Sequence, residues 1–127
     1  MKFRVFTFGH STRSFFEFLE KLQENKIGVL VDVRTHPQSR FCPQFNLKRL
    51  SEELEKAGIT YLFRGKNLGG KDENVFFNET IEDLVNMVRQ GDVLCLMCSE
   101  KDPAKCHRSQ DLAPLFVAQG FEVEHIL

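Results

Sequence analysis

The stretch IGVLVDV at residues 27–33 decides the fold of this chain. It is apolar almost throughout, which is typical of a strand covered on both faces of a parallel sheet. A second stretch of the same character, VLCLM, follows at residues 93–97. Amphipathic helical patterns stand between such strands, and this alternation predicts a mostly parallel sheet.

The flanking segments continue the alternation. Ser14 and Glu17 form a capping-box pattern that opens a helix, and Asn46 is the expected N-cap of a second helix. A third helix is expected to begin at Asn78 or Thr80. Three further strands are predicted at residues 3–8, 59–63 and 121–126.

The C-terminal third contains a separate helix signal. Asp102 supplies an N-cap acceptor and Pro103 suits the first helical position, so one long final helix is expected to run from there to Gly120. The fold class that follows is α/β. Residues 1–127 form a single domain of three layers, with a mostly parallel five-stranded sheet and helices on both faces. Its crossovers are expected to be right-handed.

Composition narrows the class of protein. The chain of 127 residues has a net charge of -1, which argues against a surface coated in positive charge for non-specific nucleic-acid binding. No apolar stretch has the length of a signal peptide or a membrane span. We therefore expect a cytoplasmic protein without membrane partners, in which the four cysteines are reduced thiols. The oligomeric state is left open.

Polar residues gather just after the predicted strands. Ligands bind at the carboxyl ends of the strands in open parallel sheets, so these residues are the candidate site. The predicted catalytic residues are His10, Asp32, Cys98 and Glu100. The predicted ligand-binding residues are Ser11, Arg13, Arg34, Arg40, Cys106, His107 and Arg108.

Each group has two interpretations. Asp32 and Arg34 share one side of an extended chain, where they form either a structural salt bridge or a ligand-facing pair. The arginines either converge on an anion, which their planar forks suit, or are scattered and solvated. His10 is either a general acid or base, or a contact that caps the neighbouring loop.

The cysteines also have two interpretations. Cys98, at a strand exit before a helix N-terminus, is either an activated thiolate or a buried apolar side chain. No metal is predicted, because the spacing of Cys42, Cys98 and Cys106 matches no usual zinc pattern. No cofactor is predicted either. Phenylalanines flank the loops and either stack on a base or close a pocket: Phe41, Phe45, Phe63, Phe76 and Phe77.

Four motifs in order resemble the DUF488 family of bacterial and archaeal proteins, to which no activity is assigned. They are FGHSTR at residues 8–13, VDVR with Pro37 and Ser39-Arg40, LGG at residues 68–70, and LMC-x-E-x-x-P-x-x-CHR at residues 96–108. The resemblance extends from the first strand to His125. It implies the same fold and supports the candidate residues, and it leaves the reaction open.

A weaker resemblance is to rhodanese-type sulfurtransferases, in which a strand ends in Asp-Val-Arg and a later strand ends in a cysteine. The match departs after Cys98, where the loop is longer and contains the acidic residues Glu100 and Asp102. Acidic side chains beside the thiol would oppose a persulfide anion.

The main hypothesis is a small enzyme, or an enzyme-like domain, that binds an anionic ligand at the strand ends. The partner is an anionic small molecule or a nucleic-acid phosphate, held by arginines. Two alternatives stand beside it. One is a rhodanese-like sulfurtransferase that uses Cys98, and the other is a nucleic-acid-binding module without catalysis.

Overall fold

The computed structural model of the chain describes residues 3–69, 74–100, 102, 105–106 and 111–127. Five strands form one sheet: β1 (Arg4–Gly9), β2 (Val29–Asp32), β3 (Thr60–Phe63), β4 (Leu94–Cys98) and β5 (Glu122–Ile126). Their order is β3-β2-β4-β1-β5, and every neighbouring pair is parallel. The predicted α/β fold with a five-stranded sheet is confirmed.

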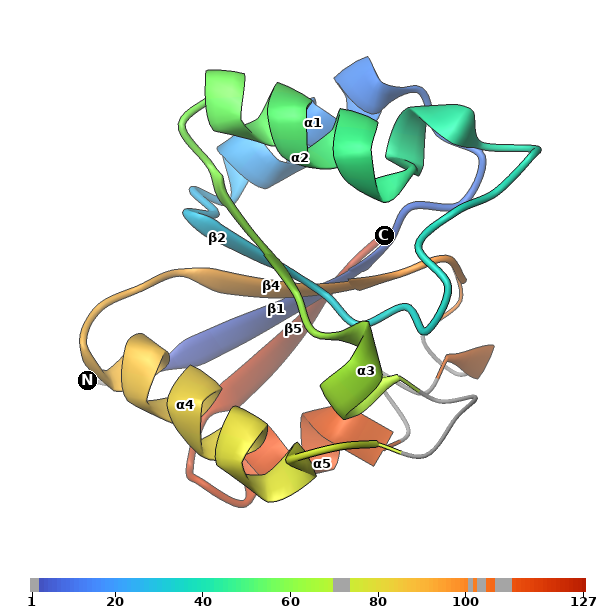
Figure 1. Cartoon of the computed structure of the whole chain (residues 1–127). Coiled ribbons are helices and arrows are strands. Elements are labelled where there is room, and N and C mark those ends of the chain that lie inside the picture. The colour runs from blue at the N-terminus through green and yellow to red at the C-terminus, as the bar shows by residue number, and fades with distance from the viewer. Residues whose placement is uncertain (1–2, 70–73, 101, 103–104, 107–110) are drawn as a thin grey trace.

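Helices cover both faces of this sheet (Figure 1). On one face lie α1 (Phe15–Glu24) and α2 (Leu47–Lys56), and on the other lie α4 (Phe77–Arg89) and α5 (Ala113–Val117). Two short helical turns sit in the loops, η1 (Pro43–Phe45) and α3 (Gly65–Leu68). Among the described residues, no helix is long and apolar enough to cross a membrane.

Strand alternation sends neighbouring side chains into two separate cores. Along β4, Cys95 and Met97 join the core beneath α1 and α2. Leu94, Leu96 and Cys98 join the opposite core, which packs against α4 and α5. Both cores are closed to solvent, which explains why the sequence of this central strand is apolar throughout.

Two of the predicted helix starts are confirmed, with one difference in mechanism. The Ser14 hydroxyl accepts a hydrogen bond from Glu17 N (3.1 Å) and caps α1. Asn46 is the N-cap residue of α2, but its side chain does not cap the helix. Instead, its Oδ1 accepts a hydrogen bond from Ser39 N (2.7 Å), which ties the preceding loop to the helix.

The third helix begins earlier than predicted. The sequence favoured a start at Asn78 or Thr80, whereas α4 begins at Phe77 and has Phe76 as its N-cap residue. Thr80 uses its hydroxyl to donate to Phe76 O (2.8 Å), so its side chain bonds within the first turn rather than capping it.

The predicted final helix does not run unbroken from Asp102 to Gly120. Within the described part of this segment, Cys106 lies in a bend, Asp111 and Leu112 form a π-helical turn, and the α-helix α5 covers Ala113–Val117. Lys105 N donates to Asp102 O (3.0 Å), a bond typical of a single tight turn. Asp102 therefore begins a turn, and the buried Cys106 side chain draws the chain back against the end of β4.

Candidate functional site

The loops that follow β1, β2 and β4 meet at one edge of the sheet and enclose a pocket of about 280 Å³. Here the chain leaves β1 toward one face of the sheet and leaves the neighbouring β4 toward the other, which is where open α/β sheets bind ligands. The pocket is lined by His10, Ser11, Thr12, Arg34, His36, Gln38, Ser39, Cys42, Ser99 and Glu100.

Backbone hydrogen bonds join the first and last of these loops. His10 N donates to Cys98 O (2.9 Å), and Ser11 N donates to Ser99 O (3.0 Å). They extend the β1–β4 pairing past the end of the sheet, so the two walls are held in fixed register. Ser11 has φ 52°, a left-handed conformation that turns the chain around the pocket.

Asp32 is fully buried and is not itself among the lining residues, and its carboxylate is saturated with hydrogen bonds. Oδ1 accepts from Arg34 N (3.0 Å) and Arg34 Nε (2.9 Å). Oδ2 accepts from Arg34 Nη2 (2.7 Å) and the Tyr61 hydroxyl (2.5 Å). Burial, assisted by the Asp32 charge, raises the pKa of Tyr61 above its usual range, so the hydroxyl stays a donor. Four donors leave this carboxylate little capacity for a ligand.

Arg34 forms the salt bridge that the sequence left as one of two alternatives. Besides its bonds to Asp32, its Nη2 donates to Phe45 O (2.7 Å) and its Nη1 to His10 Nε2 (3.4 Å). A guanidinium has five N–H donors. One N–H of Nη1 is left without a partner among the described residues, and this residue lines the pocket.

His10 is a neutral, positioned imidazole. Its Nδ1 lies 2.7 Å from Ser11 O, a carbonyl that can only accept, so Nδ1 carries the proton and Nε2 is the acceptor for Arg34. Its ring stacks on Phe45 at 4.4 Å. Burial, with the nearby Arg34 charge, lowers the pKa of His10 to about 4. The imidazole is thus uncharged at neutral pH.

Another wall of the pocket, in the loop after β2, is built around Ser39. Its hydroxyl oxygen accepts from Phe41 N (3.1 Å) and Cys42 N (3.2 Å). Because both lone pairs are occupied, the hydroxyl proton remains to be donated. The Cys42 thiol donates to Ser11 O (3.3 Å), which joins this wall to the loop after β1.

Glu100 brings a carboxylate to the pocket mouth. The residue is exposed, and its Oε1 accepts from Asp102 N (3.1 Å). With Arg34 neutralised by Asp32 and His10 uncharged, the lining residues that the structure describes carry no excess of positive charge. His36 is the other histidine at the pocket, and it too is exposed.

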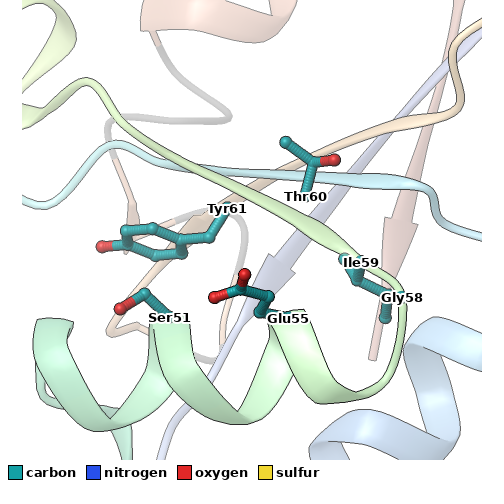
Figure 2. A pocket seen from close by; sticks show the side chains of 6 residues that line it. All are labelled: Ser51, Glu55, Gly58, Ile59, Thr60 and Tyr61. Carbon is teal, nitrogen blue, oxygen red and sulfur yellow. The ribbon is translucent and has the colours of Figure 1, made fainter.

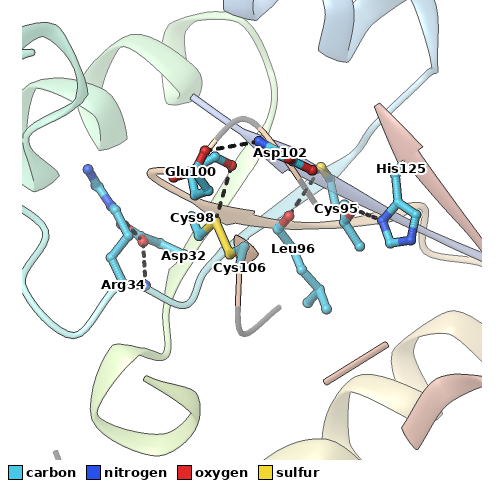
Figure 3. Close-up of a disulfide and its surroundings, with 10 residues drawn as sticks. Asp32, Arg34, Cys95, Leu96, Cys98, Glu100, Asp102, Cys106 and His125 are labelled. Carbon is cyan, nitrogen blue, oxygen red and sulfur yellow. Dashed lines mark hydrogen bonds and ion pairs between the residues drawn. A yellow bond between two sulfur atoms is a disulfide. The ribbon is translucent and has the colours of Figure 1, made fainter. Parts of the chain in front are cut away.

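The sulfur atoms of Cys98 and Cys106 are joined in a disulfide, so the prediction of four reduced thiols is wrong for this pair (Figure 3). The pair belongs to the core that packs against α4 and α5, whereas Asp32 follows Leu30 on the opposite face of β2. Neither cysteine lines the pocket. The disulfide still lies next to the pocket wall, because Cys98 Sγ is 3.6 Å from the backbone oxygen of the lining residue Glu100.

The predicted arginine cluster is only partly assembled. Arg13 packs over the Phe8 ring (4.8 Å) and donates to Leu127 O (2.8 Å), outside the pocket lining. Arg40 is exposed and does not line the pocket. His107 and Arg108 lie outside the described residues, so their roles stay predictions. Within the described part of the chain, no cluster of side chains could hold a metal ion.

Six lining residues were not among the predicted site residues: Thr12, His36, Gln38, Ser39, Cys42 and Ser99. His36 and Cys42 belong to the loop after β2, whose path depends on the Asn46–Ser39 bond. Gly65, the first residue of α3, and Gly69, its C-cap residue, also support this loop. A Cβ at Gly65 would collide with Arg34 O, and one at Gly69 with Thr35 Oγ1, so both glycines permit close packing there.

A second pocket, of about 460 Å³, lies between α2 and the edge strand β3 (Figure 2). It is lined by Ser51, Glu55, Gly58, Ile59, Thr60 and Tyr61. Although it is larger, it lies at the side of the sheet rather than at the strand ends, and no cationic side chain lines it. We therefore place the candidate site at the strand ends.

Fold and site together define a parallel α/β domain with a polar pocket at the switch in strand order. The chain matches the family described as "Domain of unknown function DUF488" over residues 14–76 and 73–110. It belongs to this family, as its motifs predicted. The FGHSTR motif and the last strand lie outside the matched segments. No curated protein matches the chain.

Proposed function

We propose that this protein binds the anionic group of a small polar ligand in the strand-end pocket. The observation that carries the proposal is the Ser39 hydroxyl, whose two lone pairs are occupied so that its proton is left to donate. The remaining N–H of Arg34 Nη1 supplies a second donor. Among the described residues, the hydroxyls of Ser11 and Thr12 have no protein partner and supply two more.

The charge balance specifies the kind of anion. Because Asp32 neutralises Arg34, the described lining residues do not favour a highly charged group. A singly or doubly charged group held mainly by hydroxyl and N–H dipoles fits better. The ligand is also expected to carry a hydrogen-bond donor near Glu100, which can only accept when ionised.

For a reaction at this site, we assign proton transfer to Glu100. It is the exposed carboxylate of the lining, whereas Asp32 is saturated and the pKa of His10 is lowered to about 4. His10 and Asp32 then act as positioning residues that orient Arg34. A sulfurtransferase reaction is not favoured, since Cys98 is paired and faces the other core.

The test is Ser11→Gly, with inorganic phosphate as the probe and isothermal titration calorimetry as the assay. Glycine suits the left-handed backbone at Ser11, so the variant should remain folded while it loses one donor. A hydrogen bond to a charged group contributes about 1.5–3 kcal/mol, so affinity should fall about 10- to 100-fold.

The matched control is Lys26→Gly. Lys26 also has a left-handed backbone, with φ 57°, but follows α1 and does not line the pocket. The Lys26→Gly variant should therefore bind phosphate with the same affinity as the wild type. Equal affinities in both variants and the wild type, or no saturable phosphate binding at all, would contradict the proposal.

A further inference from the structure

The most exposed large apolar side chain described is Phe41, at 91% of its full accessible surface. It lies between Ser39 and Cys42, which both line the strand-end pocket. Its neighbour Arg40 is exposed as well. The loop that contributes Ser39 and Cys42 to the pocket therefore also carries an exposed aromatic residue next to an exposed arginine.

The backbone beneath this ring is fixed rather than loose. Phe41 N and Cys42 N both donate to Ser39 Oγ, and Ser39 N donates to the Asn46 side chain at the start of α2. Cys42 is tied to the loop after β1 through Ser11 O. A ring held out by such a scaffold loses little backbone entropy when a flat partner binds against it.

The size of the pocket supplies the next step. At about 280 Å³, it lies at the lower end of the range of small-molecule sites, roughly 300–1,000 Å³. It accommodates a small anionic group but not a large ligand as a whole. The rest of such a ligand would extend out of the pocket, and Phe41 is an exposed ring on a loop that lines it.

We propose that the ligand is a nucleotide unit, whose phosphate occupies the strand-end pocket and whose base stacks on Phe41. Every nucleobase has a π-face, and stacking on an aromatic side chain needs an exposed ring. Arg40, exposed beside Phe41 in the chain, adds a positive charge to this loop. This inference rests on the proposed anion site and names its ligand class.

The experiment compares three probes on the intact protein by calorimetry: inorganic phosphate, ribose 5-phosphate and adenosine monophosphate. Stacking is expected to make adenosine monophosphate bind about 10-fold more tightly than ribose 5-phosphate. Phe41→Ala should abolish that ratio and leave the affinity for inorganic phosphate unchanged. Phe16→Ala is the matched control, because Phe16 is 72% exposed on α1 and does not line the pocket.

The outcomes separate this inference from the anion site. If inorganic phosphate binds but the two sugar phosphates bind equally, or if Phe41→Ala leaves their ratio intact, the nucleotide inference is wrong and the anion site stands. If none of the probes binds, both are wrong. A short single strand with a terminal phosphate, compared with the same strand without it, distinguishes a nucleic-acid end from a free nucleotide as the source.

Discussion

Asp32→Asn tests the buried network that holds the candidate site together. The substitution keeps the size of the side chain but removes the charge that neutralises Arg34, a residue only 5% exposed. Breaking a buried pair by removing one partner costs about 3–5 kcal/mol, because the other charge is left uncompensated. For 127 residues the unfolding entropy is about 0.27 kcal/mol/K, so the melting temperature should fall by roughly 11–19 °C.

The assay is thermal and urea unfolding followed by circular dichroism. The matched control is Glu53→Gln, which breaks the Lys56–Glu53 pair (3.3 Å) on the surface of α2. Exposed pairs contribute about 0–1 kcal/mol, so its melting temperature should hardly change. A loss in Asp32→Asn no larger than that of the control would refute the view that the network holds the site.

Three other predictions use the same unfolding measurements. Folding lowers the pKa of His10 from 6.5 to about 4, so the folded state favours the neutral imidazole. The free energy of unfolding should therefore be highest above pH 6.5 and should decrease as the pH falls toward 4, by up to about 3 kcal/mol. His10→Asn should flatten that part of the profile, and an unchanged profile would contradict the buried neutral imidazole. Reduction of the Cys98–Cys106 disulfide, which joins residues eight positions apart, should lower the free energy of unfolding by about 2.5 kcal/mol. In Cys98→Ser, reductant should no longer change the stability of the protein. If mass spectrometry finds both thiols free without reductant, the pairing is wrong. Gly65→Ala should destabilise the domain and broaden the amide signal of Thr35, because the added Cβ would displace Arg34 O. Gly28→Ala is the control, because a Cβ at Gly28 would meet no neighbouring atom.

The fold was predictable because its signals are local. Continuous apolar runs gave the central strands β2 and β4, and the Ser14–Glu17 pair correctly placed the start of α1. The prediction that the last helix begins at Asp102 was wrong because the path of the chain there depends on a contact between residues that are not neighbours. Asp102 followed by Pro103 satisfies the local rule for a helix start, but the pairing of Cys106 with Cys98 is a tertiary contact that no local pattern reveals.

The site was predicted as a location rather than as a set of roles. The rule that ligands bind at the carboxyl ends of parallel strands selected His10, Arg34 and Glu100, and these three residues line one pocket. The sequence left Cys98 as either an activated thiolate or a buried apolar side chain. The strand pattern favours burial away from the pocket, since residues 94, 96 and 98 alternate onto the face of α4 and α5. The contribution of Ser39 could not be predicted, because it depends on hydrogen bonds to Phe41 and Cys42 in an irregular loop.

The central claim is that the pocket at the strand ends binds an anion, and amide NMR with inorganic phosphate tests it most directly. We expect saturable shifts in the amide signals of Ser11, Thr12, Ser39 and Ser99, whose residues line that pocket. Signals of Ser51, Glu55 and Thr60, around the larger pocket beside β3, should stay unchanged. Saturable shifts confined to that second pocket, or no saturable shifts at the strand ends, would contradict the account.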